Sequence, residues 1–408
     1  MLPKVSVGRH HNLEQYRRLV GDELVDEIMA LARELAGVRI CHVNSTDSGG
    51  GVAELLSRRL PLMHSLGISA DWRLIEGKAE FFAVTKSLHN ALQGNAIDLS
   101  DADRAMYLKG NEQSARSLSG EYDVYFVHDP QPAALRRFAR GGAAKWIWRC
   151  HIDSSNPDPG ITRFLKPFIE LYDAAVFTMP EFVLPDLEAS RVTCIAPAID
   201  PFATKNMELP PDLCQRVIRD FGIDVDRPLL VQVSRFDPWK DPLGVIQAYR
   251  LVKKQVAGVQ LALIGSMAGD DPEGWEILEQ VRKEAAEDPD VFVFTNLGSL
   301  EVNAFQRGCD VVIQKSIREG FGLVVSEAFW KEKPVVAGNA GGIPMQFPEG
   351  FQQYLVETIE QCAERIVYLM KQPGEGGAFA RSGREHVLRH FLVPRLVRDE
   401  LRLIRHLL

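Results

Sequence analysis

A chain of 408 residues is too long for one ordinary hydrophobic core, so its length predicts two domains of about 200 residues each. A hydrophobic content of 46% with 25% charged residues is typical of a globular protein, and the formal charge of -8 argues against nucleic-acid binding, which needs a basic stripe. No apolar run approaches the roughly 20 residues that span a bilayer, and the first residues lack the apolar core of a secretory signal, so we expect a cytoplasmic protein with no membrane partner.

Short apolar runs, separated by helix-length segments, recur along the whole chain. Runs of this kind are typical of parallel strands that helices cover on both faces. The sequence therefore predicts an α/β protein of two doubly wound, Rossmann-like domains, one over 1–200 with an N-terminal helical extension and one over 201–385. A C-terminal helix is expected over 386–408, and its return to the first domain is left open. The predicted strands are 38–43, 70–75, 124–128, 145–150, 174–178 and 192–196 in the first half and 228–234, 259–264, 291–295, 311–314 and 334–337 in the second.

Two segments that follow strands of the first domain are candidates for ligand binding. Gly49, Gly50 and Gly51 come after the strand 38–43, where glycine lets the backbone approach a phosphate closely. A bare glycine triplet is also compatible with a simple tight turn into a helix. His151 and Asp153 end the strand 145–150, where a doubly wound domain displays ligand-binding groups, although a hydrogen-bonded turn would explain the same pair. We expect the ligand in a cleft that the two domains face.

Arg235 and Lys240 follow the first strand of the second domain. Arginine offers a fork for two phosphate oxygens and lysine a point charge, so the pair suits a diphosphate. Two solvated surface cations are the alternative. Asn296 and Leu297 come directly after the strand 291–295, and we expect them to contact the same nucleotide.

The segment from Glu319 to Glu327 places two carboxylates eight residues apart across a glycine-rich junction between a strand and a helix. Backbone N–H groups of Gly320, Phe321, Gly322 and Leu323 would lie at the helix N-terminus, which favours a phosphate. If every step were helical, the carboxylates would lie about 12 Å apart, too far to share a proton or a metal. They would instead bind opposite ends of one long ligand, and carboxylates accept strong hydrogen bonds from sugar hydroxyls. This pattern predicts a sugar-nucleotide site, whereas a lone Glu327 on a helix could simply be solvated.

Several motifs together resemble one enzyme family. Glu319 to Glu327 is similar to the E-x7-E motif of retaining GT-B glycosyltransferases of family 4, and 234–240, 341–344 and the glycine triplet resemble further motifs of that family. The matches in the N-terminal half are similar more narrowly to the trehalose synthase of the glycosyltransferring type. The resemblance covers roughly residues 36–345, and the stretch 346–354 departs from it, because the family's glycine-then-apolar run is missing there. The matching segments are 42–51, 76–86, 89–94, 149–155, 234–240 and 341–344.

The resemblance implies a role for each candidate. Arg235 and Lys240 would hold the donor diphosphate, Glu319 the donor sugar and Glu327 the ribose. His151 and Asp153 would position the sugars. Gly50, Gly51 and the 320–323 amides would bind the phosphates, and the N-terminal domain would bind the acceptor. The acceptor residues that the resemblance implies are Asn44, Glu80, Lys86, His89, Arg149 and Asp153.

The implied reaction transfers glucose from ADP-glucose or UDP-glucose to free glucose, reversibly, and forms α,α-trehalose. The mechanism that we expect is front-face attack, in which the leaving diphosphate helps remove the acceptor's proton. No tightly bound cofactor and no metal are expected, since the D-x-D strings at Asp224 and Asp288 precede strands instead of following them. Alternatives are another family 4 transferase with a different acceptor, and a catalytically silent sugar-nucleotide-binding protein. The expected partners are small sugars and sugar nucleotides, and a homodimer is possible.

Overall fold

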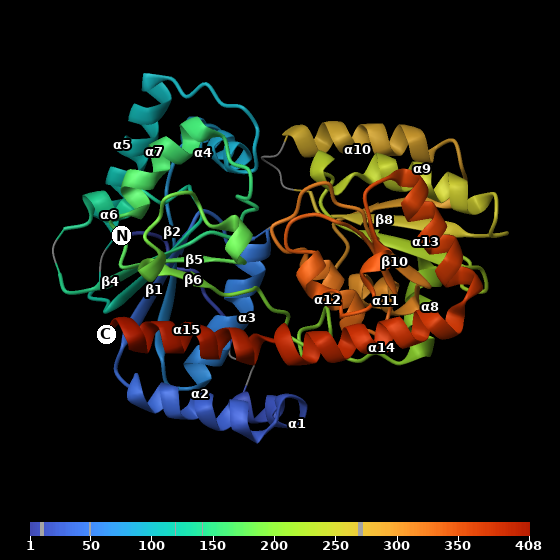
Figure 1. The fold of residues 1–408 in the computed structure, drawn as a ribbon, viewed down its shortest axis with the longest axis horizontal. Helices are drawn as coiled ribbons and strands as arrows, with labels where there is room; N and C mark the ends of the chain where they lie inside the picture. Colours follow the sequence, from blue (N-terminus) through green and yellow to red (C-terminus); the bar gives the residue numbers. More distant parts are fainter. Residues whose placement is uncertain (9–11, 49, 119, 141, 268–271) are drawn as a thin grey trace. The chain divides into compact units, whose positions relative to one another are not determined.

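The computed structural model describes residues 1–8, 12–48, 50–118, 120–140, 142–267 and 272–408, which form two compact units. The first unit comprises Met1–Pro197 together with Val393–Leu408, and the second comprises Ala198–Leu392. Each unit contains one six-stranded sheet with helices packed around it (Figure 1). The predicted fold class of two doubly wound α/β domains is confirmed.

The sheet of the first unit has the strand order β2-β1-β3-β4-β5-β6, and all of its pairings are parallel. The order reverses between β1 and β3, because β2 lies on one side of β1 and all later strands lie on the other. All six predicted strands are confirmed, with ends that shift by at most two residues. They are β1 (Arg39–Asn44), β2 (Ser69–Leu74), β3 (Val124–His128), β4 (Lys145–Arg149), β5 (Ala174–Phe177) and β6 (Val192–Cys194).

The two faces of this sheet differ in chemistry. One face packs against α4, α5 and α7 in an apolar core that includes Val43, Val127 and Trp148. Because successive side chains of a strand alternate between faces, His42, His128 and Arg149 share the opposite face, together with α3 and α15. The helices of this unit are α1 (Arg17–Val20), α2 (Asp22–Glu34), α3 (Gly51–Ser65), α4 (Ala79–Leu92), α5 (Asp101–Ser117), α6 (Leu135–Phe138), α7 (Pro159–Ile169) and α15 (Val393–Leu407).

The last helix of the chain, α15, is part of the first unit and lies beside α2 (Figure 1). Its buried apolar residues recur at helical spacing, as Val393, Leu396, Val397, Leu401 and Ile404. Ion pairs from Arg402 to Glu27 and from Arg405 to Glu34 join its solvent side to α2.

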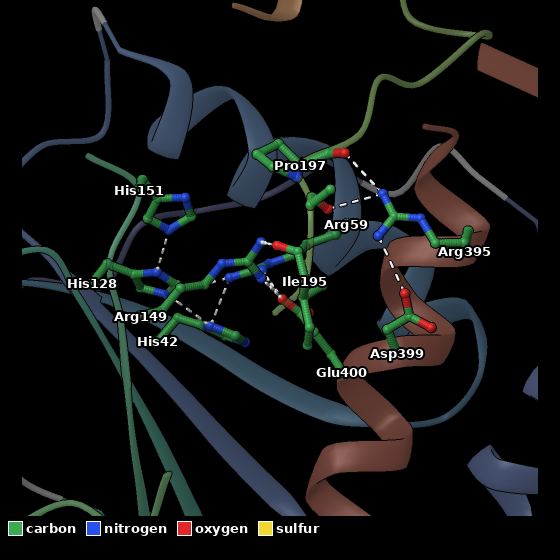
Figure 2. Close-up of polar contacts among 11 residues, drawn as sticks. His42, Arg59, His128, Arg149, His151, Ile195, Pro197, Arg395, Asp399 and Glu400 are labelled. Atoms are coloured by element: carbon green, nitrogen blue, oxygen red, sulfur yellow. Dashed lines mark hydrogen bonds and ion pairs between the residues drawn. The ribbon is translucent and has the colours of Figure 1, made fainter. Parts of the chain in front are cut away.

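One charged residue interrupts the apolar stripe of α15. The side chain of Glu400 is fully buried, and its Oε1 accepts from both Arg59 of α3 and Arg149 of β4 (Figure 2). Both guanidinium groups are themselves buried. Glu400 therefore joins the end of the chain to the centre of the first sheet through a buried ionic cluster.

The sheet of the second unit has the order β12-β11-β10-β7-β8-β9, again with parallel pairings. Here the order reverses between β7 and β10. The five predicted strands are confirmed, and a short sixth strand, β12, lies in the stretch 346–356 where no strand was predicted. The strands are β7 (Leu229–Val233), β8 (Gln260–Gly265), β9 (Val291–Thr295), β10 (Val311–Gln314), β11 (Val335–Gly338) and β12 (Leu355–Val356).

Helix starts in the second unit follow local sequence. Asp241 caps α9 with a hydrogen bond from the Gly244 N–H to its Oδ1 of 3.1 Å, and Pro242 occupies the first helical position. The helices are α8 (Pro211–Asp220), α9 (Pro242–Lys253), α10 (Pro272–Ala285), α11 (Ser299–Gly308), α12 (Leu323–Trp330), α13 (Ile359–Lys371) and α14 (Pro373–His390).

The buried cluster on α15 leads to a stability prediction. Glu400→Gln removes the carboxylate that pairs with both Arg59 and Arg149, and leaving buried charges without their partner costs about 3–5 kcal/mol. We expect a clearly lower free energy of unfolding for the first unit, measured by urea titration followed by tryptophan fluorescence. Arg402→Gln is the control, because it breaks an exposed pair of the same helix and should change stability little. Equal stability of Glu400→Gln and the native protein would contradict the prediction.

Candidate active site

Both sheets bring polar residues together at the point where their strand order reverses. In open parallel sheets, ligands bind beyond the carboxyl ends of the strands at such a reversal. In the second unit, Arg235 and Lys240 follow β7, and Glu319 follows its neighbour β10. In the first unit, Gly50 and Gly51 follow β1, and His151 and Asp153 follow β4, one strand beyond β3. The topology of each sheet therefore selects the segments that the sequence singles out.

Lys240 and Glu319 lie in direct contact in the second unit. The Nζ of Lys240 lies 2.7 Å from Oε2 of Glu319, and both side chains keep partial exposure, at 16% and 13%. Arg235 is oriented by Asp237, whose Oδ2 accepts from its guanidinium at 3.1 Å, while Oδ1 of the same carboxylate accepts from the Trp239 N–H. Asp237 thus fixes the turn that carries both cations.

The glycine-rich turn before α12 has the backbone geometry that the sequence predicts. Gly322 caps the helix at φ +79°, a left-handed conformation that other residues rarely adopt. Gly342 packs against the turn so closely that an added Cβ would meet the Gly320 carbonyl oxygen at 2.6 Å. Phe321 is buried and packs edge-on against Phe391. The amides of 320–323 therefore belong to a tightly packed turn at a helix N-terminus.

Gln346 is a residue of this site that the sequence did not point to. It is fully buried, its Nε2 donates to the carbonyl oxygens of Phe321, Gly322 and Gly342, and its Oε1 accepts from Ser326 Oγ at 2.6 Å. It lies in the stretch that departs from the family pattern, where no motif marks it. Its side chain holds the two glycine-rich turns together.

The second carboxylate of the pair has a different environment from the first. Glu327 is fully buried, and its Oε1 lies 2.8 Å from Nζ of Lys205, while Oε2 accepts from Gln306 at 3.2 Å. Burial alone would raise the pKa of Glu327, but the charges of Lys205 and Lys331 and the hydrogen bonds outweigh it, so the pKa lies below its ordinary value. Contact of Glu327 with a ribose stays a prediction, and it requires Lys205 to move aside.

Asn296 and Leu297 follow the edge strand β9, two strands away from β7. Asn296 is exposed at φ +57°, its N–H donates to the Gly265 carbonyl, and its Oδ1 accepts from the Met267 N–H. Leu297 is half-buried. Their contact with the nucleotide stays a prediction.

The glycines at the start of α3 leave open space in the first unit. Gly50 is the N-cap of the helix in an extended conformation, and Gly51 is its first residue. A Cβ added to either would meet no atom of the described structure within 4 Å. Neither backbone strain nor packing therefore explains these glycines, which is compatible with close approach of a ligand. Gly49, the first of the predicted triplet, lies outside the described residues.

Three predicted residues of the first unit are buried and hold local structure. Asn44 bonds to Trp72 Nε1 and to the Thr46 carbonyl, each at 2.6 Å, and so shapes the loop after β1. Asp153 accepts from the N–H and Oγ of Ser155. Arg149 is 1% exposed, with its guanidinium directed to Glu400 and to the Ile195 carbonyl.

The remaining acceptor candidates lie along α4. Glu80 is exposed in its first turn, and Lys86 and His89 are half-buried further along. At 1.5 Å per residue, Lys86 and His89 lie about 9 Å and 14 Å from Glu80 along the helix axis. Glu80, Lys86 and His89 therefore do not form one compact cluster, and their role as acceptor residues stays a prediction.

Asp129 is a candidate that the sequence analysis missed. It follows β3 at the reversal point, has φ +65°, and accepts from the backbone N–H of His151 at 2.7 Å. Burial raises the pKa of Asp129 to about 7, against the opposing effects of this hydrogen bond and of Arg149. Strained backbone and a shifted carboxyl at a strand end are frequent at functional sites. The pair His128-Asp129 at the end of an apolar strand was the available signal.

Both acidic residues of the second D-x-D string have structural partners. Asp288 and Asp290 pair with Lys253, and Asp290 also pairs with Arg227 at 2.6 Å. In the described part of the chain, no group of three or more His, Cys, Asp or Glu could hold a metal ion. Among the same residues, no helix is long and apolar enough to cross a membrane.

Comparisons with known proteins match both halves of the chain to described families. Residues 42–184 match the family described as "Trehalose synthase, N-terminal domain", and residues 215–386 match "Glycosyl transferases group 1". The trehalose synthase of Rubrobacter xylanophilus is 50% identical over the whole of both chains. That of Pyrococcus horikoshii is 44% identical over 94% of this chain and 93% of its own.

Solved structures show the same architecture at low sequence identity. The α,α-trehalose-phosphate synthase (UDP-forming) of Burkholderia xenovorans, in complex with glucose-6-phosphate, has a TM-score of 0.72 at 15% identity over 90% of this chain and 100% of its own. The Escherichia coli protein "Trehalose-6-phosphate", bound with UDP-2-fluoro glucose, has a TM-score of 0.71 at 14% identity over 90% of this chain and 99% of its own. At sequence identities this low, the structural similarity shows only the fold, which is GT-B. With half of its residues identical to a trehalose synthase from end to end, the chain belongs to the trehalose synthase family of GT-B glycosyltransferases.

Proposed function

We propose that the protein transfers glucose from a nucleoside diphosphate glucose to free glucose, with retention at the anomeric carbon, and forms α,α-trehalose reversibly. The observation that carries this proposal is the contact of 2.7 Å between Lys240 and Glu319 beside the N-terminus of α12. A cation next to a carboxylate matches a donor in which a diphosphate is bonded directly to a hexose.

The donor side follows from the charges in the second unit. Arg235, Lys240 and the amides of 320–323 would stabilise the negative charge that develops on the departing diphosphate, which is usually the largest contribution to catalysis. Glu319 would accept hydrogen bonds from hydroxyls of the donor glucose. Because these groups supply positive charge themselves, the proposal requires no metal and no tightly bound cofactor.

The transfer step needs positioning more than a strong base. In front-face attack, an oxygen of the leaving diphosphate takes the proton of the acceptor hydroxyl while that hydroxyl attacks the anomeric carbon. His151 and Asp153 would hold the sugars in near-attack geometry, as the resemblance implies. The neighbouring Asp129, with a pKa raised to about 7, adds a carboxyl that can donate or accept a hydrogen bond near neutral pH.

Free glucose as the acceptor is supported by the names of the relatives, which are trehalose synthases. It also fits the charges around His151. The two arginines joined to this region, Arg59 and Arg149, are buried and share Glu400, so neither offers an exposed cation to a phosphorylated acceptor. A trehalose-phosphate synthase reaction, the activity named for several structural neighbours, is the second candidate.

The diphosphate assignment predicts a loss of turnover without a loss of fold. Arg235→Ala or Lys240→Ala should lower kcat by roughly 100-fold, as removal of a transition-state donor does. Arg227→Ala is a matched control, because Arg227 precedes the same strand and pairs with Asp290 at its other end. Steady-state kinetics with ADP-glucose and UDP-glucose measure the effect, and near-native turnover in both site variants would refute the assignment.

Substitution of Glu319 and substitution of Glu327 should produce different kinetic defects. Glu327→Gln should raise KM for the nucleotide sugar more than it lowers kcat, because a ribose contact changes little during reaction. Glu319→Gln should lower kcat, since the donor sugar is the group that reacts. Thermal unfolding is measured alongside, because Glu327 is buried against Lys205. The same kinetic defect in both variants would show that the division between ribose and donor sugar is wrong.

Product analysis tests the named reaction. Glucose, glucose 6-phosphate and fructose are each supplied with ADP-glucose and UDP-glucose, and the products are identified by NMR. We expect non-reducing α,α-trehalose from glucose alone, with rejection of acceptors that lack one hydroxyl by several orders of magnitude, because buried polar groups would lose their partners. Preference for glucose 6-phosphate, or a reducing product, would overturn the named function, and nucleotide binding without any transfer would indicate a silent binder.

A further inference from the structure

Three histidines from neighbouring strands form a continuous row in the first unit. Nδ1 of His42 on β1 lies 3.2 Å from Nε2 of His128 on β3, and Nδ1 of His128 lies 3.0 Å from Nε2 of His151 after β4 (Figure 2). His42 and His128 are buried, whereas His151 keeps partial exposure. The histidine row, His42 to His128 to His151, thus leads from the protein interior to the candidate site.

Arg59 meets the inner end of this row. Its NH2 group lies 3.0 Å from Nδ1 of His42 and 3.3 Å from Nε2 of His128, and its NH1 group donates to Glu400 (Figure 2). Burial lowers the pKa of all three histidines well below the ordinary value, and the charges of Arg59 and Arg149 lower it further. The imidazoles are therefore neutral, and each has one N–H donor and one bare nitrogen.

The hydrogen-bond donors of Arg59 then determine which ring nitrogens of the histidines carry protons. A guanidinium group has donors only, so the two nitrogens that its NH2 group contacts, Nδ1 of His42 and Nε2 of His128, both act as acceptors of Arg59, and their own contact of 3.2 Å is not a hydrogen bond. His128 must then carry its proton on Nδ1 and donate it to Nε2 of His151. Since Nε2 of His151 is an acceptor, the proton of His151 lies on its outer nitrogen, Nδ1.

We propose that Arg59, held by Glu400 of the C-terminal helix, sets the tautomers of the histidine row so that His151 presents Nδ1–H as a fixed hydrogen-bond donor to the substrate. Arg59 and Glu400 are then positioning residues for the reaction. The opposite arrangement, with protons on Nε2 of both His128 and His151, would place an N–H of His128 against a cation 3.3 Å away. The fixed charge of Arg59 disfavours it.

The proposal has a chemical consequence for the site. A donor at Nδ1 suits a lone pair of a sugar hydroxyl or a phosphate oxygen, and it excludes His151 in this tautomer as the base that removes the acceptor's proton. That consequence rests on the proposed function, because it takes His151 to contact a substrate. It agrees with a mechanism in which the leaving diphosphate takes the proton.

The tautomers are measured directly in the intact protein. Proton–nitrogen correlation spectra of the protein with isotopically labelled histidine distinguish a ring nitrogen that carries hydrogen from a bare one, and His151→Gln identifies the signals of His151. We expect protonated Nδ1 in His128 and His151 and protonated Nε2 in His42. Protonated Nε2 in His151 of the native protein would overturn the proposal, whether or not the protein makes trehalose.

Arg59→Met removes the cation and leaves Glu400 paired with Arg149 alone, one negative charge against one positive charge. We expect the proton of His128 to move to Nε2, the proton of His151 to follow, and kcat/KM to fall about tenfold, the effect of one lost hydrogen bond. Arg59→Lys, which keeps a cation with donors only, should restore both. Arg402→Gln, which breaks an exposed contact of the same helix, should change neither.

Unchanged tautomers in folded Arg59→Met would refute the proposal. If this variant does not fold, the native spectrum alone decides. Native tautomers as expected, in a protein that forms no trehalose, would leave the arrangement of the row standing and refute the proposed function instead.

Discussion

The parallel direction of all strands in each sheet is the constraint on which the rest of the structure depends. Because the strands are parallel, their carboxyl ends lie at one edge of the sheet. The strand order reverses once in each sheet, between β1 and β3 in the first and between β7 and β10 in the second. Loops that leave neighbouring strands at these points diverge to opposite faces and leave room for a ligand. Arg235 and Glu319 are far apart in sequence, yet they come from adjacent strands of the same reversal. Gly50 and Asp129 correspond to them in the first unit.

The polar cluster on the first sheet shows how the end of the chain contributes to a site that it does not line. An apolar face would have packed against α15 without difficulty, but His42, His128 and Arg149 occupy its carboxyl end. Buried polar groups are costly unless each finds a partner. Glu400 supplies a negative charge in direct contact with both buried arginines, Arg59 and Arg149. The result is a chain of polar contacts from the last helix through Arg59 and His128 to His151, which a purely apolar contact would not provide.

Glu319 and Glu327 have the same side chain, but their different environments give the two carboxylates different properties. Glu319 remains partly exposed against Lys240, as expected of a group that meets a ligand, whereas Glu327 is sealed beneath Lys205 and Gln306. A partly exposed carboxylate can exchange its lysine for sugar hydroxyls more easily than a buried one. A buried one can do so only if its lysine is displaced. Lys205 lies in the segment that opens the second unit, so this segment supplies the cation that contacts Glu327.

Sequence patterns were sufficient for every described strand except β12, for the fold class and for the position of charged residues after strand ends. Apolar runs of strand length, and the position of Arg235, Lys240 and the glycine-rich turn after them, depend only on local order along the chain. The partners of Glu327, the clamp of Gln346 on the glycine-rich turns and the contact of Glu400 with Arg59 could not be predicted. Each joins residues far apart in sequence, and no local periodicity encodes which buried charge meets which. No local pattern pairs His42 with His128, because only the strand order β1-β3-β4 places their rings in contact. Local physical chemistry thus determined what each segment is, and tertiary packing decided which polar groups share a face and therefore where their protons lie.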